Sequence, residues 1–205
     1  MVFKELDRLD WQGQSAVTRH TADEQMPYYL RRYFGDSAEV DVLNQLRVST
    51  GGITTQVDHL LMHPYGLVVV DSSSVSGNFQ VREDGRWIFL HQDKPQAIQS
   101  PVTHAYSQAL SLKAFLEKKV RQKGFFDKLE LDVLVAVPDI EAIEWPSSGA
   151  LIEVCSADEV PRQVNRRVAQ YRGTGVPGLL IPEQRRRLAE FLCVKHKPLA
   201  GSRAA

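Results

Sequence analysis

Two runs of consecutive apolar residues constrain the fold of this chain more than any other feature. Leu67–Val70 and Val133–Val137 each have the length of a strand, and neither alternates with polar residues. Strands of this kind are covered on both faces, as in sheets that carry helices on each side. Both runs are far shorter than the roughly 20 residues that a membrane-spanning helix needs. The chain is therefore expected to form a helix-covered sheet and no membrane span.

The segments around the two runs predict further strands. Ile53–Met62 alternates as a strand does, and the His63–Gly66 turn leads from it into the first apolar run. Asp84-Gly85 favours a hairpin between strands at residues 79–82 and 86–91. Leu131–Val137 and a short segment at residues 151–154 complete the expected strands.

Helical spacing marks much of the remaining chain. Val40, Leu43 and Leu46 are three residues apart, which predicts a helix capped by Asp36 or Ser37. Ser100-Pro101 is a typical start for a helix, here a long one that ends near residue 123. Further helices are expected at residues 22–34, 157–171 and 182–194. This order of elements predicts a mixed α/β domain, that is, an α/β fold class.

The net charge of zero conceals two unlike halves. Residues 1–112 hold 9 basic and 13 acidic residues, whereas residues 113–205 hold 16 basic and 12 acidic ones. The balance excludes a strongly basic nucleic-acid wrapper and an acidic disordered chain. A phosphate-binding surface would draw on the second half, where Arg162, Arg166 and Arg167 share one predicted helix. The alternative for these arginines is an ordinary solvated helix face.

The N-terminal sequence and the two cysteines argue against a secreted or disulfide-rich protein. Met1–Trp11 is acidic and has no apolar run, unlike a signal peptide. Cys155 and Cys193 lie far apart, which excludes a disulfide scaffold and a zinc ribbon and favours free thiols. We therefore expect a cytoplasmic protein.

Two aspartates are the candidate functional residues. If the strands pair through the His63–Gly66 turn, Asp58 and Asp71 come close together where the second strand ends. Neighbouring carboxylates repel unless a divalent cation lies between them, and oxygen ligands suit Mg²⁺ or Mn²⁺. Glu39, on the predicted preceding helix, could supply a third carboxylate. Ordinary polar residues at strand ends are the alternative.

Two histidines flank this region. His59 and His63 are four residues apart, or roughly 13 Å along a strand, so they cannot share one metal ion. We expect polar surface histidines, with orientation of a carboxylate as the alternative role for one of them.

The residues around the aspartates follow a family pattern. Gln56–His59 and Gly66–Ser73, followed by Ser76-Gly77, carry most of it, and Gly35–Glu39, Trp87 and Ser100–His104 match more loosely. In these segments the chain resembles the nuclease-related domain (NERD), a branch of the PD-(D/E)XK nuclease-like superfamily. The likeness covers roughly residues 33–140. It implies a restriction-endonuclease-like fold, with a mixed β-sheet core flanked by helices.

The resemblance also implies roles for individual residues. Asp58 and Asp71 would be catalytic metal ligands, with Glu39 as an accessory ligand and Mg²⁺ or Mn²⁺ as the cofactor. Ser73 occupies the position of the catalytic lysine, and His104 stands where glutamine is usual. A serine cannot supply the charge of an ammonium group. Either the site has lost that charge, or Lys94 or Lys113 supplies it from elsewhere in the chain. Gln56 would contact nucleic acid, DNA in preference to RNA, and the three arginines, which lie outside the matched segments, would add phosphate contacts if their helix face binds nucleic acid.

Two functions remain open at this point. One is divalent-metal phosphodiester hydrolysis, weakened by loss of the lysine. The other is a catalytically inactive module that retains the nuclease fold and binds nucleic acid or a protein partner. The expected organisation is an N-terminal extension (residues 1–32), the nuclease-related domain (33–150) and a C-terminal helical segment (151–205) packed on it.

Overall fold

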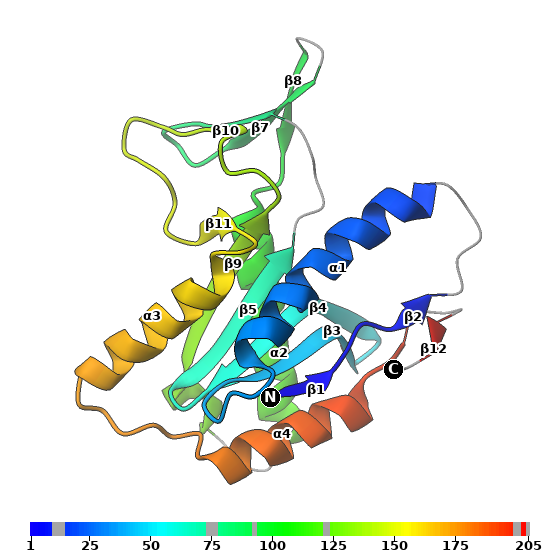
Figure 1. Cartoon of the computed structure of the whole chain (residues 1–205), viewed down its shortest axis with the longest axis vertical. Helices are drawn as coiled ribbons and strands as arrows, with labels where there is room; N and C mark the ends of the chain where they lie inside the picture. Colours follow the sequence, from blue (N-terminus) through cyan, green and yellow to red (C-terminus); the bar gives the residue numbers. More distant parts are fainter. Residues whose placement is uncertain (10–14, 73–77, 92–93, 121–123, 199–201, 204–205) are drawn as a thin grey trace.

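The computed structural model describes residues 1–9, 15–72, 78–91, 94–120, 124–198 and 202–203, and its main sheet has six strands (Figure 1). Their order is β1 (Val2–Lys4), β3 (Asp41–Thr50), β4 (Ile53–His63), β5 (Gly66–Ser72), β9 (Glu130–Val137) and β11 (Val154–Ser156). β3, β4 and β5 are antiparallel neighbours, whereas β9 runs parallel to β5 and β11 runs parallel to β9. The sheet is therefore mixed, as predicted.

A smaller sheet extends beyond the main one, at the top of Figure 1. Its order is β10 (Ile143–Glu144), β6 (Asn78–Val81), β7 (Trp87–His91) and β8 (Lys94–Ile98). The hairpin predicted at Asp84-Gly85 joins β6 to β7 and is confirmed. A two-stranded pairing of β2 (Arg8–Leu9) with β12 (Ser202–Arg203) completes the described strands.

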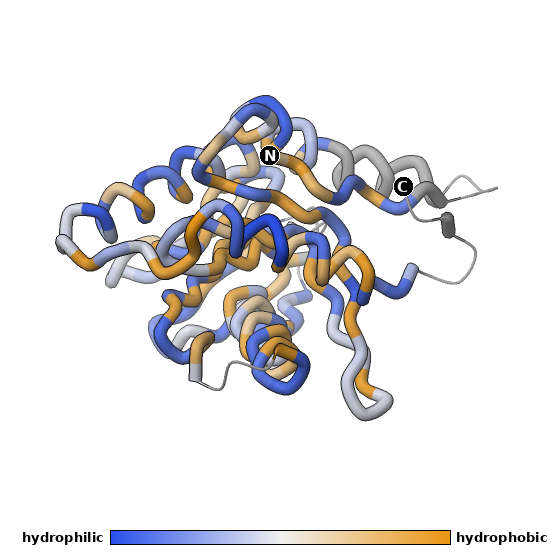
Figure 2. Tube along the Cα trace, turned by 90° about the horizontal axis from the view of Figure 1, so that it is seen from below, coloured by the Kyte–Doolittle hydropathy of each residue, from blue (hydrophilic) through white to orange (hydrophobic). Residues whose placement is uncertain are grey.

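Helices cover both faces of the main sheet (Figure 1). Leu67 and Val69 of β5 pack in one core cluster with α2 (Pro101–Lys119) and α4 (Pro182–Lys195). Val68 and Val70 pack in a second cluster with α1 (Ser15–Phe34) and α3 (Val160–Gly173). In Figure 2, hydrophobic stretches run through the interior of the trace. Alternate residues of the apolar run therefore pack into the cores on opposite faces of the sheet, which confirms the prediction of a sheet covered on both faces.

The turn between β4 and β5 requires a glycine. Gly66 starts β5 opposite Glu130 of β9, and a Cβ atom on it would lie 2.0 Å from the Glu130 carbonyl oxygen. No side chain fits at that distance. Gly66 therefore lets the start of β5, the strand that carries Asp71, approach β9.

The helix predicted around Val40, Leu43 and Leu46 is wrong, because these residues lie in or next to strand β3. Their spacing of three arises from an irregular strand. Leu43 and Leu46 lie in the same core cluster, although a regular strand places residues i and i+2 on one face. Between them, Gln45 has a φ of 52°. This left-handed residue interrupts the alternation of side chains, so that Leu46 points to the same face of the sheet as Leu43.

The other predicted helices are present with shifted ends. Ser100 caps α2 by accepting a hydrogen bond from Thr103 N, as its sequence indicated. The first helix is longer than expected and keeps Pro27 inside it. The expected boundary between residues 32 and 33 falls within this helix, whose Met26 and Leu30 belong to the core. No helix among the described residues is long and apolar enough to cross a bilayer.

A buried arginine fixes α4 to the sheet. Arg185 is 2% exposed, and its guanidinium donates to Asp41 Oδ2 (3.0 Å) and to the carbonyl oxygens of Ala38 and Leu180. Arg185 thus contacts residues far apart in the sequence and is not part of a solvated basic face. Of the Arg185–Arg187 run, only Arg186 and Arg187 are exposed.

Candidate functional site

The structure brings Asp58 and Asp71 together on the central strands β4 and β5. His59 lies opposite Val70, so the next position along each strand places Asp58 across from Asp71. Asp71 is 8% exposed, and Asp58 Oδ2 accepts a hydrogen bond from Ser72 N (3.1 Å). The predicted pairing of these two carboxylates through the turn is therefore present.

Asp58 lies where the sheet departs from regular pairing. Asn44 pairs with His59 and Leu46 with Val57, which leaves Asp58 facing the left-handed residue Gln45. A non-glycine residue with positive φ is strained, and such strain clusters at functional sites. A polar cavity of about 40 Å³, large enough for a water-sized ligand, opens at this point. It is lined by Leu6, Gln45, Gln56, Asp58, His59 and Ser72.

The electrostatic environment of Asp58 disfavours its charge. Burial raises the pKa of this carboxyl above its ordinary value, and the charge of Asp71 raises it further. His59, the Ser72 backbone N–H and the Gln56 side chain act in the opposite direction without cancelling the effect. Gln56 Nε2 lies 3.4 Å from Asp58 Oδ1. Two acidic groups are thus held together in a partly desolvated place, an arrangement that a bound cation would relieve.

A chain of hydrogen bonds behind Asp58 orders Ser72. His59 is 1% exposed, and burial lowers its pKa to about 4, so its ring is neutral at neutral pH. Its Nδ1 donates to Asn44 Oδ1 (2.8 Å), and its Nε2 is hydrogen-bonded to Ser72 Oγ (3.1 Å). Ser72 N–H then donates to Asp58. His59 therefore orients a carboxylate through Ser72, and the expectation of a surface histidine is wrong here.

Asp71 is held from the opposite side by helix α2. His104 lies in the first turn of α2, and its Nδ1 is 2.9 Å from Asp71 Oδ2. The other ring nitrogen faces Gln108 Nε2 at 3.4 Å. About half of the His104 side chain is exposed, so this ring also borders solvent. The residue that departs from the family's usual glutamine is therefore in direct contact with the acidic pair.

His63 is also buried, contrary to expectation, but at the far end of the sheet. It is 0% exposed and stacks on Tyr171 with 6.0 Å between the ring centroids. Its Nδ1 accepts a hydrogen bond from Tyr65 N (3.2 Å). Burial, together with the nearby guanidinium groups of Arg185 and Arg167, lowers the pKa of His63 to about 4.

This shift predicts acid destabilisation. As the pH falls from 6.5 towards 4, the unfolded chain binds a proton at His63 that the folded protein resists, so stability is lost over this range. The full shift corresponds to about 3 kcal/mol. A His63→Phe variant keeps an aromatic ring and cannot take up the proton. Urea unfolding at several pH values should show a shallower pH dependence in this variant, and parallel curves would contradict the prediction.

Glu39 lies away from the acidic pair. It precedes β3 at the end where Asp41 pairs with Met62, several residues along the sheet from Asp58. Its carboxylate binds Arg172 at 2.6 Å. The structure therefore does not bring Glu39, the predicted accessory metal ligand, to the acidic pair. Ser73, the residue at the lysine position, lies outside the described residues.

Neither candidate lysine reaches the site. Lys113 forms an ion pair with Asp127 at 2.8 Å. Lys94 is exposed at the start of β8 in the smaller sheet. Among the described residues, the only basic side chain in contact with the Asp71 carboxylate is His104, and no lysine pairs with Asp58.

The three arginines of α3 differ in their surroundings. Arg167 is 13% exposed and donates to the Val133 carbonyl oxygen (3.0 Å), with Asp132 at 3.5 Å. Arg162 pairs with Glu159. Arg166 is exposed and makes no ion pair with any described residue. Arg167, which the sequence predicted as a nucleic-acid contact, thus has its guanidinium bound within the protein.

The signals for the supporting residues were weak in the sequence. Asn44 and Gln45 are two polar residues inside a strand. Their hydrogen-bond partners, His59 and Asp7 respectively, are distant along the chain. Gln45 Oε1 accepts a hydrogen bond from Asp7 N (2.9 Å). No group of three or more His, Cys, Asp or Glu side chains in the described part of the chain is placed to hold a metal ion. Any cation at Asp58 and Asp71 would therefore have two carboxylate ligands.

A helix-covered mixed sheet with paired aspartates on central strands fits a nuclease-like α/β protein. Residues 19–138, more than half of the chain, match the family model of the nuclease-related domain. The chain belongs to this family. No curated protein and no solved structure matches it. The matched range begins inside α1 and ends just after β9, and it includes Asp58, Asp71 and His104.

Proposed function

We propose that this nuclease-related domain hydrolyses phosphodiester bonds of nucleic acid, DNA in preference to RNA, with Mg²⁺ or Mn²⁺ at Asp58 and Asp71. The observation that supports the proposal is the close placement of the two carboxylates in a partly desolvated position. Such a pair costs stability in the absence of a cation, which is the signature of a functional rather than a structural arrangement.

The residues present fit a hard divalent cation. Mg²⁺ is commonly held by one or two carboxylates and keeps several of its waters, whereas zinc takes at least three protein ligands. Asp58 and Asp71 supply two carboxylates, and the 40 Å³ polar cavity adjoins Asp58. When bound, the cation would act as a Lewis acid and lower the pKa of a coordinated water.

The surrounding side chains of this chain would position the ligands. Ser72 N–H holds Asp58 Oδ2, and the buried ring of His59 fixes Ser72. His104 donates from Nδ1 to Asp71 Oδ2 and so limits the rotation of that carboxylate. Hydrogen bonds of this kind set the direction in which a carboxylate presents its oxygens.

The test is a cleavage assay with the full chain. Labelled single-stranded DNA, duplex DNA and RNA are incubated with Mg²⁺, with Mn²⁺ or with EDTA, and wild type is compared with Asp71→Asn. We expect cation-dependent cleavage by the wild type alone, with DNA cleaved faster than RNA. Equal product from both proteins would show that any observed cleavage comes from a contaminant, and the catalytic proposal would fail.

His104 provides a second prediction. His104→Ala removes the donor to Asp71 and should lower cleavage by about 10- to 100-fold. His104→Gln, which restores the residue usual in the family, should retain activity within about fivefold, since the amide can still donate to Asp71. Thr103→Ala, at the exposed neighbouring position, is the control and should leave the rate unchanged. Equal loss in the Ala and Gln variants would contradict a positioning role.

A non-catalytic binding module is the second candidate, and Ser73 at the lysine position favours it. In this case exposed basic residues of α3 would contact phosphates without cleavage. Arg166→Ala should then weaken binding to all sequences alike and lower the slope of log K against log salt by about 1. Arg167→Ala should instead destabilise the fold, because the Val133 carbonyl oxygen loses its donor and Asp132 loses its cationic partner. An unchanged salt slope in Arg166→Ala would mean that α3 does not contact nucleic acid and that its exposed arginines form an ordinary solvated surface.

A further inference from the structure

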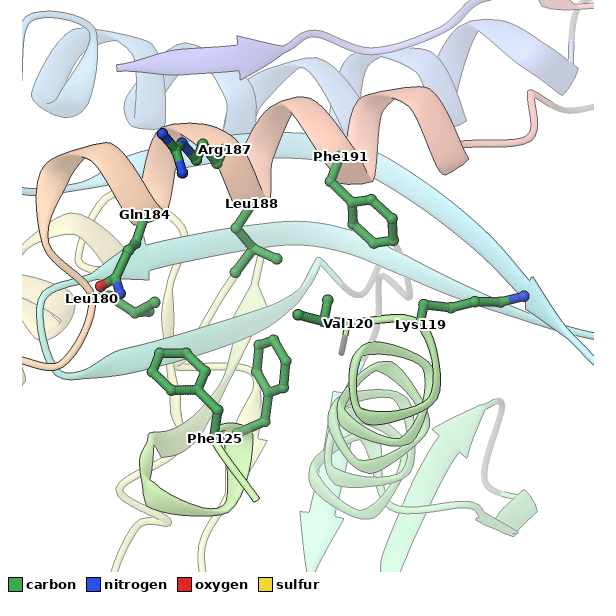
Figure 3. Close-up of a pocket in the computed structure, with 9 residues that line it drawn as sticks. Lys119, Val120, Phe125, Leu180, Gln184, Arg187, Leu188 and Phe191 are labelled. Atoms are coloured by element: carbon green, nitrogen blue, oxygen red, sulfur yellow. The ribbon is translucent and has the colours of Figure 1, made fainter. Parts of the chain in front are cut away.

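A second cavity lies apart from the acidic pair, between the C-terminal end of α2 and helix α4 (Figure 3). The short 3-10 helix Phe126–Lys128 closes one side. Its volume is about 620 Å³, which falls within the range of small-molecule binding sites. The residues that line it are Lys119, Val120, Phe125, Phe126, Leu180, Gln184, Arg187, Leu188 and Phe191.

The walls of this cavity are mainly apolar. Figure 3 shows Leu188 and Phe191 pointing from α4 towards Val120. Val120, Phe125 and Phe191 are only half-buried, so their apolar surface is open to an incoming group. Apolar side chains left open in a concave site provide binding energy through removal of their surface from water.

The charge at the border of the cavity is positive. Lys119 and Arg187 are both exposed there, and Lys195 lies 5.9 Å from the centroid of the Phe191 ring. Arg187 is partly neutralised by Glu183, whereas Lys119 has no ion pair among the described residues. None of the described residues that line the cavity is acidic. An apolar interior with a cationic border is complementary to a molecule with an apolar body and one negative group.

We propose that this cavity binds a small amphiphilic monoanion, an acyl or aryl carboxylate, whose apolar part lies against Val120, Phe125 and Phe191. Its carboxylate would lie at the border near Lys119. A cationic amphiphile would meet like charge there, and an uncharged one would lack the ionic contact. The site is independent of the proposed nuclease function, because it uses none of the residues around Asp58 and Asp71.

Decanoate is the probe for this site, titrated into the full chain by isothermal calorimetry. We expect saturable binding with a Kd below about 1 mM. Val120→Trp fills the cavity with a larger ring and should weaken binding by at least about tenfold. Leu110→Trp is the matched control, because Leu110 is 59% exposed on α2, the helix that precedes Val120, and does not line the cavity. Circular dichroism confirms that both variants are folded.

Charge is tested with a second pair of variants. Lys119→Glu should weaken decanoate binding about tenfold or more and leave decanol binding unchanged. Lys118→Glu makes the same change at the exposed neighbouring residue, which does not line the cavity, and should have little effect. No saturation of decanoate by 1 mM, or equal binding by wild type and Val120→Trp, would overturn the site. Equal affinity for decanoate and decyltrimethylammonium would overturn the assignment of an anion.

Discussion

Replacing Asp58 with asparagine is expected to abolish cleavage and, at the same time, to stabilise the protein. The nuclease proposal requires the Asp58 carboxylate as a metal ligand. Loss of a metal-based contribution of several kcal/mol corresponds to a fall in rate of about 1,000-fold or more. The gain in stability follows from the raised pKa of Asp58, which shows that the fold disfavours the ionised form.

The sign of the stability change depends on pH. At high pH wild-type Asp58 is ionised beside Asp71, and asparagine removes that charge while its Oδ1 can still accept from Ser72 N–H. We therefore expect the free energy of unfolding to rise by about 1 kcal/mol at pH 8 in EDTA. As the pH falls, protonation of Asp58 stabilises the wild type, so the difference in unfolding free energy between Asp58→Asn and the wild type shrinks. Urea unfolding at two pH values measures it, and a destabilised variant would mean that Asp58 is a structural residue.

Arg185→Met should be the most destabilising single change outside the hydrophobic core. It leaves Asp41 without its guanidinium partner and leaves the Ala38 and Leu180 carbonyl oxygens without their donor. Removing one member of a buried ion pair typically costs about 3–5 kcal/mol. We expect a loss of this size in the free energy of unfolding, because α4 would lose its polar attachment to β3.

Arg186→Met is the matched control for this prediction. Arg186 is the exposed next residue of the same helix, so the same substitution there should change stability by no more than about 0.5 kcal/mol. The free energies of unfolding of both variants are compared from their urea midpoints, with the dependence of unfolding free energy on urea concentration taken as the same. A similar small effect in the two variants would show that the Arg185 contacts contribute little, and that apolar packing alone holds α4.

The fold class could be predicted because its signal is local. Leu67–Val70 is apolar throughout, and this run alone requires cover on both faces of a sheet. The segment from Val40 to Leu46 has helical spacing in the sequence but forms part of a strand, for a physical reason. The strand turns over at Gln45, so that Leu43 and Leu46 share a face at a spacing that normally belongs to a helix.

The same irregularity appears on the partner strand. Val57 and Leu60 lie in one core cluster at a spacing of three, with Asp58 and His59 between them. Neither strand's sequence shows alone that the two irregularities face each other. The acidic pair was predictable because the turn sets which residues oppose one another, but the strained backbone beside it was not.

Long-range partners explain the remaining errors. Arg167 and Arg185 look like members of solvated basic faces, since a helical sequence does not show which residues of other elements approach it. One is bound to the backbone of β9, and the other reaches Asp41 across 144 residues. Glu39 precedes a strand and not the expected helix, and it lies at the end of β3 that is remote from Asp58. His104, by contrast, was already marked in the sequence by its departure from the family's glutamine.

The most direct test of the proposed metal centre is Mn²⁺ binding, followed by electron paramagnetic resonance of the free ion. The wild-type chain should bind one Mn²⁺, and both Asp58→Asn and Asp71→Asn should weaken that binding at least about tenfold. Asp36→Asn, at an exposed carboxylate, should bind as the wild type does. The same Mn²⁺ affinity in all four proteins would contradict a metal centre at Asp58 and Asp71.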